Sequence, residues 1–221
     1  MPLELTPIFE FALRGYEGTE AAKKFATDFQ TKAGQAKLLA PTMAFMGERV
    51  EFYLRDVMGF AYDVVNAVLM AAKDNVVDAI ARARAVTQAR PSEDFEHISI
   101  AFKRIKNILR QAQETGKRIA PEYNAQHLRE DAEKKLDSEM RTIAARVEPL
   151  RAQGNYSDAM VEISKLRPAV DTFFDKVMVM VEDDHLRAAR LALLENLLRN
   201  FSTIADFSEI VPKEAAKAAA G

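Results

Sequence analysis

Residues 166–207 read LRPAVDTFFDKVMVMVEDDHLRAARLALLENLLRNFSTIADF and contain two sets of apolar residues at helical spacing. The first set comprises Val170, Phe173, Phe174, Val177, Met178 and Val181, and the second comprises Leu186, Leu191, Leu194, Leu197, Leu198 and Phe201. The pattern predicts two packed helices, with Pro168 in the first turn of one and an acidic turn at 182–184 between them. Because the second helix is apolar around more than half of its circumference, it must contact several neighbours. This stretch is therefore predicted to form the centre of a helical core.

Further helices are expected along the rest of the chain, because apolar residues recur at helical spacing through most of it. The expected helices cover residues 3–16, 19–33, 42–58, 63–72, 74–89, 93–113, 121–153 and 156–166. Pro41 and Pro121 are placed at the starts of two of them. Strand signals are nearly absent, and the run at 177–181 is interpreted as buried helix rather than strand. The predicted fold is an all-α, multi-helix bundle.

Composition divides the chain into segments. Residues 1–40 are interpreted as a helical lead-in and 41–211 as the main helical domain, within which 115–155 form a more polar helical insertion. The helix expected at 121–153 carries a narrow apolar stripe between alternating charges, which is typical of a helix that projects and packs along one seam. Residues 212–221 form a tail rich in Ala and Lys without periodicity, which we expect to be flexible.

Length and composition limit the possible functions. A chain of 221 residues with 48% hydrophobic residues can bury one sizeable core. No apolar run approaches the roughly 18 residues that cross a bilayer, so we expect a cytoplasmic protein with no membrane partner. The absence of cysteine excludes disulfides and thiolate metal sites. No glycine-rich nucleotide loop is present and the three histidines lack metal-ligand spacing, so the chain alone is predicted to be non-catalytic, with no cofactor or metal.

The helix expected at 93–113 has an apolar side and a basic side. At 100° per residue, one side collects Phe95, Ile98, Phe102, Ile105 and Leu109. Another side collects Lys103, Lys106, Asn107 and Arg110, with Arg104 on its far flank. In a chain with a net charge of −2, such a local excess of cations is suited to contacts with phosphates. Basic side chains that merely solvate an exposed face would give the same pattern.

Four blocks of this sequence, in one order, resemble the C-terminal end of the bacterial glycyl-tRNA synthetase β subunit. The blocks are Glu48-Arg49 to Leu54-Arg55, Tyr62-Asp63-Val64-Val65 to Ala67-Val68-Leu69, Asp94-Phe95 to Phe102-Lys103-Arg104-Ile105-Lys106-Asn107-Ile108-Leu109, and Val170–Met180 followed by Arg187, Arg190–Leu194 and Ile204–Ser208. The resemblance implies an all-helical, DALR-like anticodon-binding domain, similar to the one that ends arginyl-tRNA synthetases, with a projecting long helix or helical hairpin.

The resemblance also implies a function and partners. The chain would help a glycyl-tRNA synthetase to select its tRNA, and its partners would be the tRNA(Gly) anticodon, the rest of the β subunit and the α subunit, with no DNA. In that family the separate α subunit uses the ATP and glycine. The residues expected to contact RNA are Lys103, Arg104, Lys106, Asn107 and Arg110, with Arg187 and Arg190 as a second group. Basic side chains would position phosphates, and Arg or Asn would bond the edges of anticodon bases, which the resemblance implies are cytosines.

Other interpretations of the same residues stay open. Arg187 and Arg190 lie one turn apart, and one of them is also placed to pair with Asp171, Asp175 or Glu182 instead. Candidates for stacking on unpaired bases are Tyr53, Tyr62, Tyr123 and Tyr156, although a tyrosine that buries its ring and keeps its hydroxyl wet fits equally well. At the level of function, the alternatives are a structural docking module that reads no bases and an independent hydrolase or regulator.

Overall fold

The computed structural model describes residues 4–72, 74–117, 119 and 123–212, and the regular structure in those residues is helical throughout. Its elements are α1 (Leu5–Arg14), α2 (Glu20–Lys23), α3 (Ala26–Phe29), α4 (Lys32–Phe52), η1 (Tyr53–Val57), α5 (Tyr62–Leu69), α6 (Val76–Ala89), α7 (Glu93–Glu114), η2 (Ala125–His127), α8 (Asp131–Ala152), α9 (Tyr156–Ser164), α10 (Arg167–Lys176), α11 (Asp184–Phe201) and η3 (Phe207–Glu209). No strand occurs in the described residues, which confirms the all-α prediction. None of the helices described there combines the length and apolar character needed to cross a bilayer.

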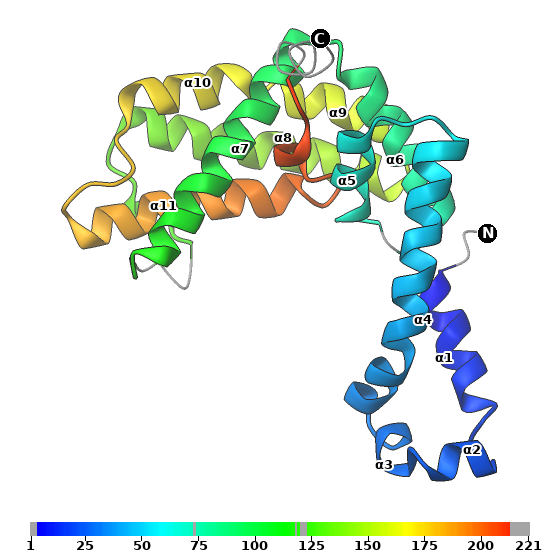
Figure 1. The fold of residues 1–221 in the computed structure, drawn as a ribbon. Coiled ribbons are helices and arrows are strands. Elements are labelled where there is room, and N and C mark those ends of the chain that lie inside the picture. The colour runs from blue at the N-terminus through cyan, green and yellow to red at the C-terminus, as the bar shows by residue number, and fades with distance from the viewer. Residues whose placement is uncertain (1–3, 73, 118, 120–122, 213–221) are drawn as a thin grey trace.

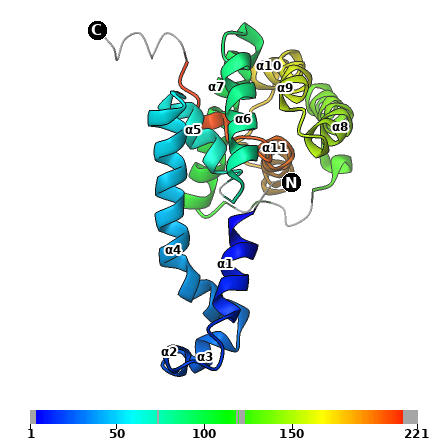
Figure 2. The ribbon, with the colours of Figure 1, turned by 90° about the vertical axis from the view of Figure 1, so that its right-hand side faces the viewer.

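The helices form a body and an arm. Figure 1 shows the body, α5–α11, and the arm, α1–α4, which extends away from it. Figure 2, turned by 90°, shows α11 between α7 and α8. Within the body, α7 packs against α9, α10, α11 and η3, while α8 packs against α9, α10 and α11. The stretch 166–207 therefore lies between two long helices.

α11 is the central helix that its apolar pattern predicts. Five of its large side chains are fully buried: Leu191, Leu193, Leu194, Leu197 and Phe201. The prediction that the two helices of this stretch pack on each other is wrong, because α10 and α11 each pack mainly on α7 and α8. An apolar pattern on several sides of a helix predicts that neighbours cover it, but not which neighbours.

The connection between α10 and α11 is not helical, so the helix predicted through 177–181 is wrong. α10 ends at Lys176, and Val177 has the extended backbone angles φ −113° and ψ 119°. Val177 and Val179 are buried, whereas Met178 between them is 73% exposed. This alternation is the two-residue period of extended chain. Because every residue from 177 to 181 is Val or Met, the sequence does not show which of them face the core, and the two-residue period was missed.

The polar segment at 115–155 does not project. Pro121 lies outside the described residues, and the helix expected to begin there, α8, begins instead at Asp131. α8 buries Leu136, Met140, Ile143 and Val147 against α9, α10 and α11. The predicted projection from the body is found instead in the arm (Figure 1).

The arm is built around α4, a 21-residue helix with Pro41 inside it. The prediction that Pro41 opens a helix is wrong, because the Thr31 hydroxyl caps α4 earlier by accepting from the Gly34 amide (3.0 Å). Gly34 is required there, since a Cβ would lie 2.3 Å from the Asp28 carbonyl oxygen. The expected boundary between residues 40 and 41 therefore falls within one continuous helix. Of the expected tail, residues 213–221 lie outside the described part of the chain.

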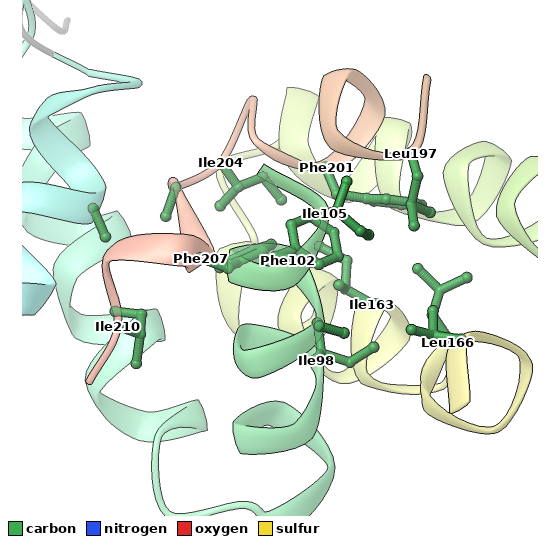
Figure 3. Packing of buried hydrophobic residues seen from close by; sticks show 14 of the residues in the cluster. Ile98, Phe102, Ile105, Ile163, Leu166, Leu197, Phe201, Ile204, Phe207 and Ile210 are labelled. Carbon is green, nitrogen blue, oxygen red and sulfur yellow. The ribbon is translucent and has the colours of Figure 1, made fainter. Parts of the chain in front are cut away.

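The segment after α11 returns to the middle of the body. Phe207, in η3, is fully buried and meets Phe95 and Phe102 of α7 edge to face, with ring centroids 5.5 and 5.4 Å apart. Figure 3 shows Phe207 beside Phe102 within the apolar cluster. The Asp206 amide also donates to the Ala67 carbonyl of α5 (2.8 Å). η3 therefore joins α5 to α7.

Phe207→Ala should lower the free energy of unfolding by about 3–5 kcal/mol, because it leaves a cavity between α7 and η3. Urea unfolding followed by circular dichroism measures the change. Phe11→Ala is the control, since Phe11 in α1 is 79% exposed, and its effect should stay within about 0.5 kcal/mol. Equal effects of the two substitutions would contradict the packing described for η3.

Candidate nucleic-acid interface

α7 has the two-sided character that its sequence predicts. Glu93, Asp94 and Glu96 lie in its first turn, where negative charge favours the positive end of the helix dipole. Gly116 follows its end in the left-handed conformation, at φ +67°. The apolar side is buried, from Phe95 to Ala112. The opposite side of the helix faces solvent.

Lys103, Asn107 and Arg110 lie on that outer side, at spacings of four and three residues, and all three are exposed. We call these three residues the outer stripe of α7. Within the described part of the chain, Lys103 has no ion pair and the Asn107 side chain has no hydrogen bond. Arg110 pairs with Glu114 of the same helix (3.1 Å), and both side chains are mostly exposed. Such a pair is weak in water, so a phosphate can displace the carboxylate.

Lys106 is turned away from the outer stripe and holds η3. Its Nζ lies 2.9 Å from Asp206 Oδ2 and 3.0 Å from Glu209 Oε1, and it donates to Ser208 Oγ (3.1 Å). Partial burial lowers the pKa of Lys106, but its bonds to the two carboxylates more than offset this and raise the pKa above 10.5. Lys106, which was expected to contact RNA, is therefore paired at the surface with two carboxylates of this chain.

Arg104 lies on the flank of α7, as predicted, and faces α10. Its guanidinium carbon is 4.0 Å from the centroid of the Phe174 ring. Cation–π contact of this kind fixes a long side chain without neutralising its charge. Arg104 is exposed, so it adds a positioned cation beside the outer stripe.

Arg187 and Arg190, the second predicted group, are buried, with 6% and 4% of their surface exposed. Arg190 pairs with Glu133 of α8 and donates to the Met178 carbonyl (2.7 Å). Arg187 pairs with Asp184 and donates to the Val181 carbonyl (2.6 Å). Both guanidinium groups therefore hold the non-helical connection between α10 and α11. The sequence also predicted pairing of one of them with an acid, but the partners are Asp184 and Glu133 rather than Asp171, Asp175 or Glu182, and the buried guanidinium groups are not available to a ligand at the surface.

Glu133 is the partner that sequence reasoning missed. It was interpreted as part of a charged, solvated face of α8, yet it is fully buried. Its Oε2 accepts from the amides of Arg129 (2.7 Å) and Glu130 (3.0 Å), so it also closes the capping box of α8. The spacing of Glu130 and Glu133 at a helix start was the available signal. No sequence signal indicated the contact of Glu133 with Arg190, which lies 57 residues away in the chain.

The tyrosines that were candidates for base stacking occupy different environments. Tyr62 and Tyr53 are exposed near the junction of the arm and the body. Tyr156 is buried, and its hydroxyl binds Asp78. Tyr123 is half-buried, and its hydroxyl binds Asp137 of α8. Over the residues described, no group of three or more His, Asp or Glu side chains is arranged to hold a metal ion.

Comparison with known proteins gives one family match and several relatives. A family model described as the DALR anticodon binding domain matches residues 98–213, from α7 past η3. The chain is similar to the glycine–tRNA ligase β subunit of Acidobacterium capsulatum, with 56% identity over 173 residues, which are 76% of this chain and 24% of that protein. It is also similar to the glycine–tRNA ligase β subunit of Escherichia coli O1:K1, with 37% identity over 190 residues, or 86% of this chain and 27% of that protein. The chain thus spans about a quarter of the length of these curated relatives.

Arg190→Met should lower the free energy of unfolding by roughly 3–5 kcal/mol, because it leaves the Glu133 carboxylate buried without its partner. The double variant Glu133→Gln/Arg190→Met should recover part of this loss, since neither charge then remains. Urea unfolding of the two variants measures both effects. Arg146→Met, which changes an exposed arginine on α8, should cost less than about 1 kcal/mol. A single variant as stable as the wild type would show that Arg190 is not structural.

The contact between Lys106 and Asp206 should make stability depend on acid pH. Burial raises the pKa of Asp206, but hydrogen bonds from Ser208 and Lys106 more than offset this, so its pKa lies below 3.8. A carboxylate with a depressed pKa stabilises the fold above its unfolded pKa of about 3.9, and this contribution is lost as the pH falls. Asp206→Asn should therefore be less stable than the wild type at pH 7, and the difference in free energy of unfolding should shrink below about pH 4. A difference that stays constant down to pH 2.5 would contradict this assignment.

Proposed function

Since this chain belongs to the DALR anticodon-binding domain family, we propose that it binds the anticodon arm of a tRNA through the outer stripe of α7. The observation that carries the proposal is the exposure of Lys103, Asn107 and Arg110 side by side on a helix whose other side is buried. All three residues lie within the matched span. Arg104, fixed over Phe174, extends this surface along the flank of α7.

The chemistry of the outer stripe suits an RNA loop. Lys103 and Arg110 would contact phosphates, which set the position of the RNA without reading its sequence. The Asn107 amide offers one acceptor and two donors, and an unpaired base presents complementary groups along its edge. Arg104 would supply a guanidinium plane beside the loop. Each residue thus has a separable role in position or in base reading.

We further propose that the RNA is tRNA(Gly) and that the chain acts within a glycine–tRNA ligase. Both relatives described above carry that name as β subunits. On this proposal, the chain selects the tRNA, while a separate α subunit uses ATP and glycine and the rest of the β subunit completes the assembly. The chain itself would need no cofactor and would work in the cytoplasm, without contact to DNA or a membrane.

A second candidate function, docking within a synthetase without base reading, is favoured by the arm. α1 buries none of its residues. Large apolar side chains are exposed along the arm and at its junction with the body: Ile8, Phe11, Tyr16, Phe25, Phe45, Phe52, Tyr53 and Val57. Exposed apolar side chains at this density are typical of surfaces that contact another protein. The two functions use different parts of the chain, so variants can separate them.

Lys103→Glu/Arg110→Glu should weaken binding of a tRNA(Gly) transcript and reduce its salt dependence. Each lost phosphate contact lowers the slope of log K against log salt by about 1, so the double variant should lose up to about 2. Fluorescence anisotropy at four salt concentrations measures the slope. Lys134→Glu, an exposed lysine on α8, is the control and should behave like the wild type. An unchanged affinity of the double variant would instead favour the docking function.

Asn107→Ala separates base reading from attraction to phosphates. It should leave the salt slope unchanged but reduce the preference for tRNA(Gly) over a copy with a substituted anticodon, because only base edges distinguish the two RNAs. The same anisotropy measurement, made with both transcripts, gives the ratio of affinities. A ratio equal to that of the wild type would remove Asn107 from the proposed site.

A further inference from the structure

A second polar surface lies on α11, away from its buried leucines. Asn196, Arg199 and Asn200 share one side of the helix, at spacings of three and four residues. They line a surface hollow of about 680 Å³, together with Met140 and Arg141 of α8 and with Tyr123. We call this the α8–α11 hollow. Its volume is in the range of small-molecule binding sites.

Among the described residues, the hollow carries one cation without an ion pair, Arg199. Two guanidinium groups line it and no carboxylate does. The other lining arginine, Arg141, is paired with Asp137, which is mostly buried and accepts from the Arg141 Nε (3.0 Å) and from the Tyr123 hydroxyl. Arg199 has no ion pair in the part of the chain that the structure describes. By contrast, the buried arginines at 82, 187 and 190 are all bound to carboxylates and backbone carbonyls. Arg199 therefore has no structural role of that kind.

The two asparagines are oriented by their own hydrogen bonds. Asn196 Oδ1 accepts from Arg199 Nη2 (3.0 Å) and from Asn200 Nδ2 (3.2 Å), and Asn200 Nδ2 also donates to the Asn196 carbonyl (2.8 Å). These bonds leave Asn196 Nδ2 and Asn200 Oδ1 without partners among the described residues. One donor and one acceptor therefore remain on neighbouring amides. This is the combination that pairs with the edge of a nucleobase.

Tyr123 supplies a fixed aromatic ring on the same hollow. Its hydroxyl is held by Asp137, and the Arg141 guanidinium carbon lies 5.8 Å from the ring centroid. Burial and the Asp137 carboxylate raise the pKa of Tyr123 well above its ordinary value, so the ring carries no negative charge at neutral pH. An uncharged aromatic ring beside cations can stack with a base without repelling its phosphate.

We propose that the α8–α11 hollow binds one unpaired nucleotide, with its base against Tyr123 and the two asparagines and its phosphate on Arg199. The inference rests on the proposed function, because the nucleotide is taken to come from the bound tRNA. It adds a second RNA contact that lies on α8 and α11 and is separate from the outer stripe of α7. A free nucleotide would present the same chemistry, and the test distinguishes the two sources.

The test uses the full chain and a tRNA(Gly) transcript. Arg199→Gln and Asn200→Ala should each weaken tRNA binding roughly tenfold, within the range of losses seen for base contacts. Arg146→Gln is the matched control, since it changes another exposed arginine, on α8, that pairs with Glu162 outside the hollow. Thermal unfolding should show that all three variants keep the stability of the wild type, because none of these side chains is buried.

Two further substitutions test the role of the ring. Tyr123→Phe keeps the stacking surface and should retain tRNA affinity, whereas Tyr123→Ala should lose about as much as Arg199→Gln. The contrary result is that Arg199→Gln and Asn200→Ala bind tRNA as tightly as the wild type while Lys103→Glu/Arg110→Glu binds weakly. That result would overturn nucleotide binding in the hollow and leave the proposed function standing.

The source of the nucleotide is tested with cytidine monophosphate and adenosine monophosphate, each titrated alone into the chain by calorimetry. Weak binding of either, lost in Arg199→Gln, together with tight tRNA binding supports a tRNA nucleotide in the hollow. Nucleotide binding by a chain that binds no tRNA would assign the hollow to free nucleotides and overturn the proposed function. Binding of neither nucleotide nor tRNA would overturn both proposals.

Discussion

The buried ion pair between Arg190 and Glu133 constrains the whole body. Two charges taken out of water are tolerated only when each is fully bonded, and Glu133 meets this by also accepting two amides at the start of α8. The pair joins α8 to α11. The hydrogen bond from Arg190 to the Met178 carbonyl also ties the connection between α10 and α11 to these two helices. The rotation of α11 about its axis is thereby fixed. Its leucines face the interior, and Asn196, Arg199 and Asn200 face outward.

A similar use of charge on α7 decides what that helix can offer to a partner. Lys106 forms ion pairs with Asp206 and Glu209. These pairs hold η3 on α7, where Phe207 packs against Phe95 and Phe102. Arg104 is held by an aromatic ring instead of an acid. The helix therefore divides its polar residues between holding the fold and facing solvent. A count of cations along the sequence does not reveal that division.

Local periodicity was sufficient to predict much of the fold. α7 and α11 follow from apolar residues that recur within each helix, and the exposure of Lys103 and Arg110 follows from the same periodicity. The failures have long-range causes. Glu133 is buried because Arg190 reaches it from another helix, and 177–181 is not helical because Val177 and Val179 both join the core while Met178 between them is exposed. Pro41 was misplaced because a long helix tolerated it in its interior, despite the hydrogen bond that proline removes.

On the proposed function, a chain with a net charge of −2 is suited to selecting an RNA rather than to holding any RNA tightly. The sequence-independent part of RNA affinity grows with the number of phosphates neutralised. Lys103 and Arg199 are exposed without an ion pair among the described residues, whereas arginines such as Arg55, Arg141 and Arg167 are paired with acids. A weak general attraction leaves a larger share of the binding free energy to contacts that depend on the base. On the proposed function, those contacts are the amides of Asn107, Asn196 and Asn200, which are neutral and therefore add discrimination without adding attraction to every nucleic acid.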